Sequence, residues 1–139
     1  MPALTRWYIK TSLLYLIVAL VIGGLLAGRS ALGLPSEIGA LSPVFFHLFM
    51  VGWVSELIFG VVYWMFPKMS RENPRGNAQV AWGTYVALNV GLLLRAVGEP
   101  MASLTGSTGW GVALALSAFL QWIAGMAFVV STWPRVKER

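Results

Sequence analysis

The chain has 139 residues, of which 58% are hydrophobic and only 11% charged, and its mean hydropathy is +0.73. This composition excludes an ordinary soluble domain and indicates an integral membrane protein. Cysteine is absent, which excludes disulfides, thiolate chemistry, iron–sulfur clusters and haem attached through cysteine. The net charge of +5 does not indicate nucleic acid, because the basic residues lie at the ends of apolar segments and form no patch with interleaved aromatic residues.

Four apolar segments follow one another, each with the length of about 20 residues that a membrane-spanning helix needs. The first runs from about residue 8 to residue 28, and the second from about residue 43 to residue 66, where Pro67 ends it. The third runs from about residue 78 to residue 97, where Gly98, Glu99 and Pro100 stop it, and the fourth from about residue 110 to residue 133. We therefore expect an all-α fold, a four-helix transmembrane bundle that forms a single domain over residues 1–139.

A signal peptide is the rival interpretation of the first segment. A basic start, an apolar run and small residues near Gly28 are the features that such a peptide shows. The apolar run is long for a signal peptide, so we expect it to be retained as a helix.

The basic residues indicate the orientation of the bundle in the membrane. One side carries most of them: Arg6, Lys10, Lys68, Arg71, Arg75, Arg135, Lys137 and Arg139. The opposite side carries only Arg29, with Arg95 just inside a span. The positive-inside rule therefore predicts that both termini lie in the cytoplasm.

Apart from Lys10, which belongs to the basic inner side, three residues of charged type or histidine lie within the expected spans: His47, Glu56 and Arg95. Such residues are costly in lipid and are candidates for function. With a rise of about 1.5 Å per residue, His47 and Arg95 lie about 12 and about 10 Å to the outer side of the midpoints of their spans, so they share a level. Glu56 falls near the midplane, and we expect it to form one polar layer with Asn89 and Gln121.

His47 and Glu56 are expected to face opposite ways, since nine steps of about 100° separate them on a regular helix. Glu56 shares its face with Gly52 and Gly60, which permit another helix to approach closely. Two interpretations of Glu56 stay open. In the first, Glu56 is hydrogen-bonded to Asn89 or Gln121 and holds the helices together within the membrane. In the second, it is the proton or substrate site of a small transporter or channel without haem.

His47 is the only histidine of the chain, and it also has two interpretations. It is a hydrogen-bonding residue between helices, or it is a ligand of haem iron, which takes a neutral imidazole as its usual donor. Zinc or copper chemistry has little support, because one histidine and no cysteine cannot supply three or four ligands from one chain.

The stretch HLFMVGWVSELIFGVVYWMFPKMSR resembles the haem-ligating helix of the catalytic subunit of heme-copper oxidases, most closely the C-type oxidases and the related nitric oxide reductases. The resemblance covers about 25 residues. The matching positions are His47, Gly52, Trp53, Gly60, Tyr63, Pro67 and Lys68.

The resemblance implies that His47 ligates a haem b. In that family the helix carries a His-x-His pair, whose first member binds the high-spin haem and whose second binds the low-spin haem. His47 matches the second member, while Phe45 stands in place of the first and cannot ligate iron. The copper ligands have no counterpart, so we do not expect a terminal oxidase or a nitric oxide reductase.

Three sources of a second axial ligand stay open: His47 of a second copy, a methionine such as Met50 or Met101, or none. A symmetric dimer is favoured, because one histidine per chain then supplies two ligands, although trimers or higher forms stay open.

Other residues are expected around this haem. Phe46 and Trp53 are candidates for the walls of the haem site, with packing or lipid contact as the alternative. Arg95 and Arg29 are candidates to pair with the haem propionates, although Arg95 alternatively pairs with Glu99 or extends to the membrane surface.

The sequence thus predicts a small haem b membrane protein, resembling a fragment of a heme-copper oxidase subunit. Its expected role is electron transfer with a redox partner protein, or gas binding at an open iron site, in the cytoplasmic membrane of a prokaryote. The transporter or channel built on Glu56 is the alternative. A structural subunit of a larger complex is the third interpretation.

Overall fold

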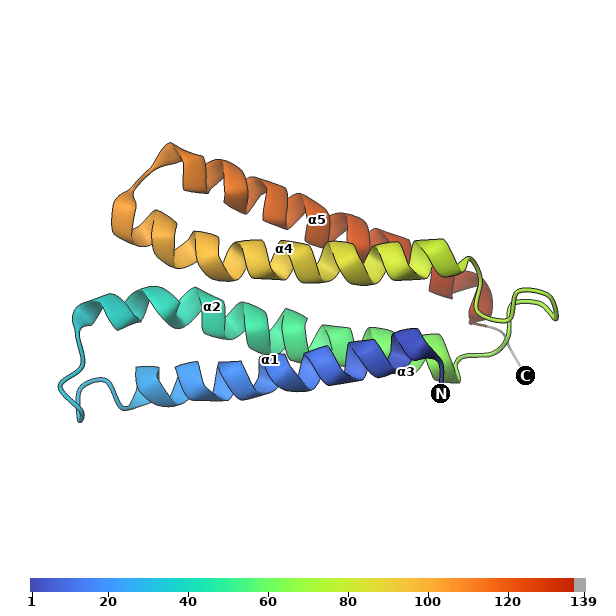
Figure 1. Cartoon of the computed structure of the whole chain (residues 1–139), viewed down its shortest axis with the longest axis horizontal. Helices are drawn as coiled ribbons and strands as arrows, with labels where there is room; N and C mark the ends of the chain where they lie inside the picture. The colour runs from blue at the N-terminus through green and yellow to red at the C-terminus, as the bar shows by residue number, and fades with distance from the viewer. Residues whose placement is uncertain (137–139) are drawn as a thin grey trace.

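The computed structural model describes residues 1–136, and all regular structure within that range is helical (Figure 1). The elements in chain order are α1 (Ala3–Ala27), the short 3₁₀ helix η1 (Ser36–Leu41), α2 (Ser42–His47), the π-helical η2 (Leu48–Ser55), α3 (Glu56–Met65), α4 (Ala78–Thr105), α5 (Thr108–Thr132) and the 3₁₀ turn η3 (Trp133–Arg135). Four helical stretches are long and apolar enough to cross a membrane: Ala3–Ala27, Ser36–Met65, Ala78–Thr105 and Thr108–Arg135. The prediction of four membrane-spanning helices is therefore confirmed in these coarse terms.

The helices form two hairpins that lie side by side (Figure 1). In one hairpin α1 runs beside the second span, which consists of α2, η2 and α3; in the other, α4 runs beside α5. The start of α1 and the end of α5 lie at the same end of the bundle. We call this the inner end, and the opposite end the outer end. Lys137 and Arg139, two of the basic residues used to predict orientation, lie outside the described residues.

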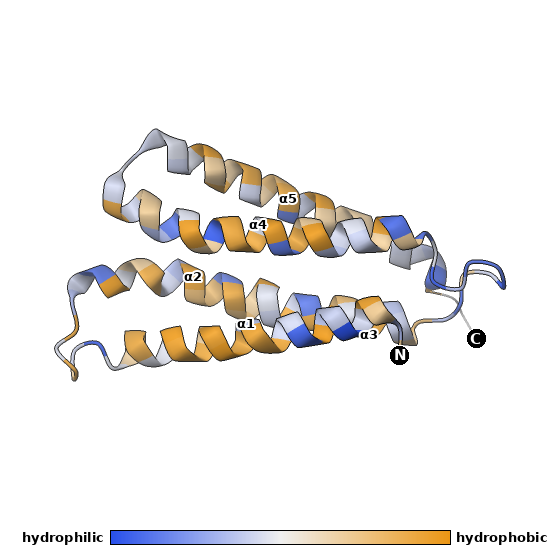
Figure 2. Ribbon diagram, viewed as in Figure 1, coloured by the Kyte–Doolittle hydropathy of each residue, from blue (hydrophilic) through white to orange (hydrophobic). Residues whose placement is uncertain are grey.

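The surface of the bundle is largely apolar, as a membrane requires. Large hydrophobic side chains such as Leu14 (60% exposed), Val112 (71%) and Met65 (68%) point outward. Hydrophobic residues dominate the helices in Figure 2, and hydrophilic positions interrupt them at a few places. Lipid tails are themselves apolar, so the hydrophobic effect does not drive the helices together, and packing and polar contacts between them matter more.

Two expected helix boundaries differ from the structure. The first helix begins at Ala3, earlier than expected, and the third continues to Thr105 instead of ending at Val97. Pro100 lies inside α4 and has no N–H to donate to the carbonyl one turn earlier, yet the helix continues past it. The helix ends at Gly106, whose φ of 62° is left-handed and whose N–H donates to the Ala102 carbonyl at 3.0 Å.

Two glycines of the second span permit α1 to approach closely. A Cβ at Gly60 would lie 2.6 Å from Tyr8 Cβ, and one at Gly52 would lie 2.9 Å from Tyr15 Cβ. Neither position has room for a methyl group. The side of the second span that carries these glycines therefore packs against α1.

The π-helical segment η2 separates His47 from Glu56. The Ser55 hydroxyl donates to the Met50 carbonyl five residues earlier, at 2.9 Å. A π turn joins residues five apart and so takes more residues per turn than an α turn, which changes the direction of every side chain after it. The expectation that the two ionisable residues face opposite surfaces is wrong, because both contact α4.

Candidate functional site

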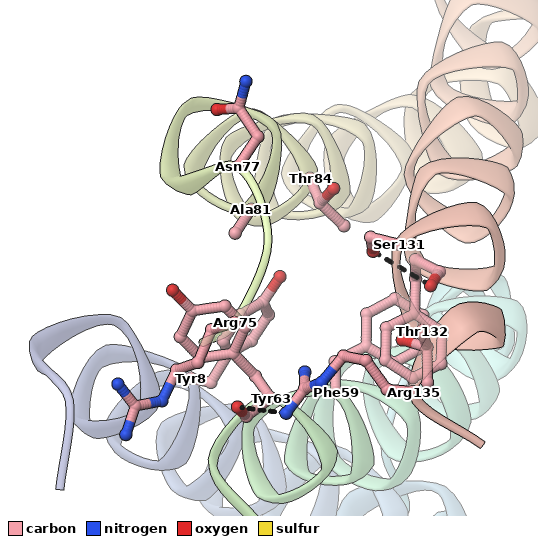
Figure 3. A pocket seen from close by; sticks show the side chains of 11 residues that line it. Tyr8, Phe59, Tyr63, Arg75, Asn77, Ala81, Thr84, Ser131, Thr132 and Arg135 are labelled. Carbon is pink, nitrogen blue, oxygen red and sulfur yellow. Dashed lines mark hydrogen bonds between the residues drawn. The ribbon is translucent and has the colours of Figure 1, made fainter. Parts of the chain in front are cut away.

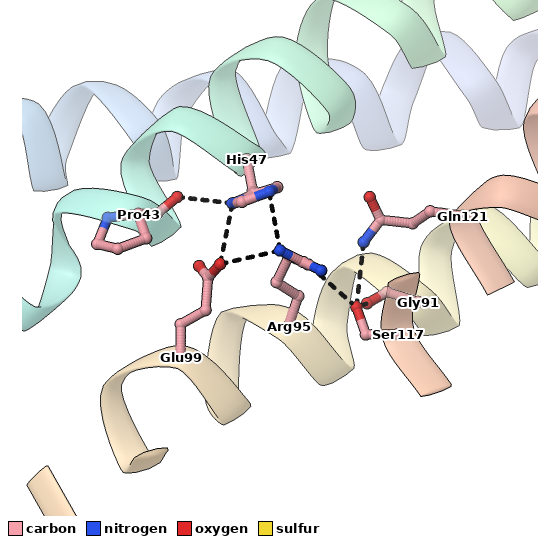
Figure 4. A network of polar contacts seen from close by, with 7 residues as sticks. All are labelled: Pro43, His47, Gly91, Arg95, Glu99, Ser117 and Gln121. Carbon is pink, nitrogen blue, oxygen red and sulfur yellow. Dashed lines mark hydrogen bonds and ion pairs between the residues drawn. The ribbon is translucent and has the colours of Figure 1, made fainter. Parts of the chain in front are cut away.

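An outer polar cluster surrounds His47, at the junction of α2 and η2 (Figure 4). His47 Nδ1 lies 2.9 Å from the Pro43 carbonyl oxygen, one turn earlier, and His47 Nε2 lies 3.1 Å from Arg95 Nη1 on α4. A guanidinium can only donate, so Nε2 must accept from Arg95. Nδ1 then carries the ring hydrogen, and Nε2 carries the lone pair.

Glu99 completes the charges of the outer cluster. Its Oε1 lies 3.2 Å from Arg95 Nη1 and 3.2 Å from His47 Nδ1. The side chains are partly accessible, with 30% of His47, 20% of Arg95 and 11% of Glu99 exposed. The contact between His47 and Arg95 agrees with the shared level expected from the sequence, and Arg95 adopts the ion pair with Glu99 that was one of its alternatives.

The outer cluster extends to α5 through Ser117. Arg95 Nε donates to Ser117 Oγ at 3.3 Å, and this hydroxyl donates to the Gly91 carbonyl at 2.7 Å. Gln121 Nε2 also donates to Ser117 Oγ, at 3.1 Å (Figure 4). The expectation that Gln121 joins the layer of Glu56 is therefore wrong: its side chain reaches back one turn along its own helix to Ser117.

A middle polar cluster surrounds Glu56, the first residue of α3, which is fully buried. Its Oε1 accepts from Thr11 Oγ1 at 2.7 Å and from Asn89 Nδ2 at 2.8 Å. The Tyr15 hydroxyl donates to Asn89 Oδ1 at 2.6 Å. The pair of Glu56 and Asn89 agrees with the expected layer. The sequence analysis did not identify Thr11 and Tyr15. Two hydroxyl side chains one turn apart in an apolar helix would have indicated a polar contact with another helix.

The two oxygens of the Glu56 carboxyl group have different surroundings. Oε1 has two donors, whereas Oε2 is buried with no hydrogen-bond partner among the described residues. The ion pairs within residues 1–136 all belong to the outer cluster, so the described hydrogen-bond partners of Glu56 are neutral groups.

A third polar contact joins the hairpins at the inner end. Arg135 is only 2% exposed and donates to the carbonyls that end the second span: those of Pro67 at 3.0 Å, Phe66 at 2.9 Å and Tyr63 at 3.2 Å. The last carbonyls of a helix lack partners within it and carry partial negative charge. Sequence reasoning treated Arg135 only as part of a basic tail, because its proximity to the second span comes from the fold.

The other predicted haem-site residues do not touch the imidazole of His47 through polar contacts. Phe46 (59% exposed) and Met50 (53%) lie on the outside of the bundle, and Trp53 packs against Phe49 with ring centroids 4.8 Å apart. Arg29 lies in the loop after α1, where it donates to the Ser36 carbonyl at 3.5 Å.

Comparison with protein-family models, with curated proteins and with solved structures returns no match. The resemblance to heme-copper oxidases therefore stays a prediction. What the fold defines is a helical protein with four helices of membrane-spanning length and apolarity. Among residues 1–136, no three histidine or acidic side chains gather as a metal site.

The donor chemistry of His47 fits haem iron. Iron takes an imidazole nitrogen with a free lone pair, and the other ring N–H is normally held by a carbonyl or carboxylate that fixes the ring. His47 has both features, because its Nδ1–H faces the Pro43 carbonyl and its Nε2 carries the lone pair. Arg95 is the one described group that contacts Nε2, and it is held on a long, flexible stem.

Proposed function

We propose that this protein is a small haem b-binding membrane protein in which His47 ligates the iron and the bound haem carries electrons. The observation that supports this most is the anchored imidazole, with Nδ1 held 2.9 Å from the Pro43 carbonyl and Nε2 kept as the lone-pair nitrogen. The haem, when bound, supplies the one-electron chemistry. The chain supplies the ligand, the orientation and the charges around it.

Arg95 has a second role in this proposal. Its guanidinium donates to the His47 lone pair in this structure, and with His47 on the iron it would be free to pair with the haem propionates. Glu99, 3.2 Å from Arg95 Nη1, limits how far the guanidinium can move. Arg29 is the second candidate for the propionates, because it too lies toward the outer end.

A second copy of the chain completes the site. Each chain has one histidine, so a symmetric pair of chains gives two imidazoles on one iron. The His47 side chain is 30% exposed, and its neighbours Phe46 and Met50 are more than half exposed. A partner copy seated there covers these side chains and walls the haem against lipid.

The proposal places the haem near the outer surface of the cytoplasmic membrane of a prokaryote, with both termini in the cytoplasm. Arg6, Lys10, Lys68, Arg71 and Arg75 support this orientation, since they belong to the inner end where α1 starts and where the second span ends. A redox partner protein then meets the site from the outer side.

Haemin titration of the purified, haem-free protein tests the proposal. We expect a sharp low-spin spectrum after reduction, and we expect His47→Ala to weaken haem binding at least about tenfold, the scale of losing even an indirect contact to a metal ligand. Ile58→Ala, on an exposed position of the same span, is the matched control and should bind normally.

Arg95→Ala and Arg29→Ala divide the roles of the two arginines. If Arg95 holds the propionates, only the first substitution weakens binding of haemin, and neither changes binding of a haem whose propionates are esterified. Equal binding of haemin by the wild-type protein and His47→Ala would contradict the proposal.

A further inference from the structure

Glu56 lies in a site that no part of the haem proposal uses. It is fully buried, near the middle of the bundle, and its Oε2 has no hydrogen-bond partner among the described residues. An isolated ionised carboxylate is far more costly to bury than a neutral acid. Its surroundings therefore decide whether it carries a proton.

The groups around Glu56 come from two helices besides its own. On α1 these are Tyr8, Thr11 and Tyr15, and on α4 they are Tyr85 and Asn89. None of them is a cation, and α5 has no ionisable side chain between Thr108 and Thr132. The surroundings therefore favour a neutral carboxyl group, with a proton on Oε2.

A cavity of about 20 Å³ lies near the inner end, and Tyr8, Tyr63 and Arg135 are among the residues that line it (Figure 3). Its polar lining includes Tyr8, Tyr63, Arg75 and Thr84. A water needs at least about 10–15 Å³ of such space and several polar partners, so this cavity has room for one. The Tyr8 hydroxyl has no hydrogen-bond partner within residues 1–136, which leaves it available to that water.

Two residues of α1 lie between this cavity and Glu56: Tyr8 lines the cavity, and Thr11 contacts Glu56. Tyr8 and Thr11 are one turn apart on the same face, and the Thr11 hydroxyl donates to Glu56. On the outer side, the Tyr15 hydroxyl gives its proton to the Asn89 amide at 2.6 Å. A hydroxyl accepts one proton while it donates another, whereas an amide does not readily do so, so the inner side offers the better route.

We propose that Glu56 is a proton-binding site at the middle of the membrane that exchanges its proton with the inner end along Tyr8 and Thr11. The proton passes between the Glu56 carboxyl group and water of the cavity through the Thr11 and Tyr8 hydroxyl groups, each of which accepts one proton as it gives up another, and it returns by the same route. No oxidant or second substrate takes part. The proposal does not depend on haem or on His47.

Infrared spectroscopy of the protein at pH 8 tests whether Glu56 is protonated. Exposed glutamates have a pKa near about 4.3 and are ionised at this pH. We expect a carbonyl band of a protonated carboxylic acid that Glu56→Gln removes and that Glu99→Gln, the matched control at an ion-paired glutamate, leaves in place. A band that survives Glu56→Gln, or no such band in the wild-type protein, overturns the proposal.

The direction of exchange is tested by transfer into heavy water. We expect Tyr8→Phe to slow the shift of this band at least several-fold, because it removes the hydroxyl at the cavity. Tyr15→Phe, the matched control on the outer side, should not slow it. The reverse result, or equal rates in all three proteins, contradicts entry from the inner end.

Glutamine keeps the carbonyl oxygen that Thr11 and Asn89 bind, so Glu56→Gln should fold, and circular dichroism checks this. If it does not fold, wild-type protein labelled with ¹³C-carboxyl glutamate gives the answer, since an isotope-shifted acid band at pH 8 requires a protonated glutamate. His47→Ala should keep the band, so failure of the haem proposal is distinguishable from failure of this one.

Discussion

The outer and middle polar clusters stabilise the same pair of hairpins by different chemistry. The outer cluster contains both signs of charge, Arg95 and Glu99, and it is partly exposed. The middle cluster contains one acid, Glu56, which is fully buried and bound by the neutral side chains of Thr11 and Asn89. Charged side chains therefore occur in the outer cluster, where each has a partner of opposite charge and is partly exposed. In the middle cluster the buried carboxyl group of Glu56 is bound by neutral hydrogen-bond donors.

This difference also separates two kinds of possible function. The outer cluster presents a lone pair on His47 beside the Arg95 guanidinium, and the haem proposal rests on these two groups. The middle cluster contains the carboxyl group of Glu56, whose Oε2 has no hydrogen-bond partner among the described residues and can carry a proton. One membrane span carries both groups, and the π-helical segment between them directs both toward α4.

Glu56→Lys should produce the largest effect on stability. It places a cation at the middle of the membrane, where translocon scales assign about 2.5–3.5 kcal/mol to a lysine. We expect a loss of unfolding free energy of about 3 kcal/mol, measured by denaturation in mixed detergent micelles. Glu56→Gln, the neutral control, should lose less than about 1 kcal/mol; a larger loss means that Glu56 acts as a charge.

Gly60→Ala should produce the second-largest loss of unfolding free energy, because it disrupts the close packing of α1 against the second span beside Glu56. The new Cβ would lie 2.6 Å from Tyr8 Cβ, so α1 must shift away. Overpacking of this kind costs about 1–3 kcal/mol. Gly125→Ala is the control, since nothing lies within 4 Å of a Cβ there, and it should be neutral or slightly stabilising.

Asn89→Leu should cost about 1–2 kcal/mol, the upper range for a hydrogen-bonding side chain between membrane helices. It removes one donor to Glu56 and leaves the Tyr15 hydroxyl without its acceptor. Denaturation in detergent measures the loss. If Tyr15→Phe combined with Asn89→Leu costs no less than the sum of the single changes, the two residues do not act as a pair.

A double-mutant cycle of Arg95 and Glu99 should give the smallest coupling, about 0.5–1 kcal/mol, because the pair is partly exposed. Added salt should weaken this coupling. The coupling between Glu56 and Asn89 should not change with salt, since neither carries a charge in the proposed state. Equal salt dependence of the two couplings would remove the distinction between the clusters.

The sequence predicts the features that depend on length and rise along a helix. The four spans follow from their apolar runs, and the shared level of His47 and Arg95 follows from the rise per residue; the contact between them in the structure agrees with that level. Direction around the helix was predicted incorrectly for Glu56, because no residue pattern marks a π-helical segment and the angle per residue was taken as constant.

The remaining errors arise from contacts between helices. Gln121 reaches Ser117 instead of Glu56, and Arg135 folds back on the end of the second span. Depth alone does not show which neighbour a side chain meets. The sequence predicts that the third span ends at Gly98, Glu99 and Pro100, but α4 continues past Pro100 to the left-handed Gly106.

Haem content of the protein purified from haem-replete cells tests the central claim most directly. The pyridine haemochrome spectrum identifies the haem and, divided by the polypeptide concentration, gives the number bound per chain. We expect haem b, one for every two chains, and none in His47→Ala. Folded wild-type protein without haem, or haem that remains in His47→Ala, would contradict the claim that His47 is a haem ligand.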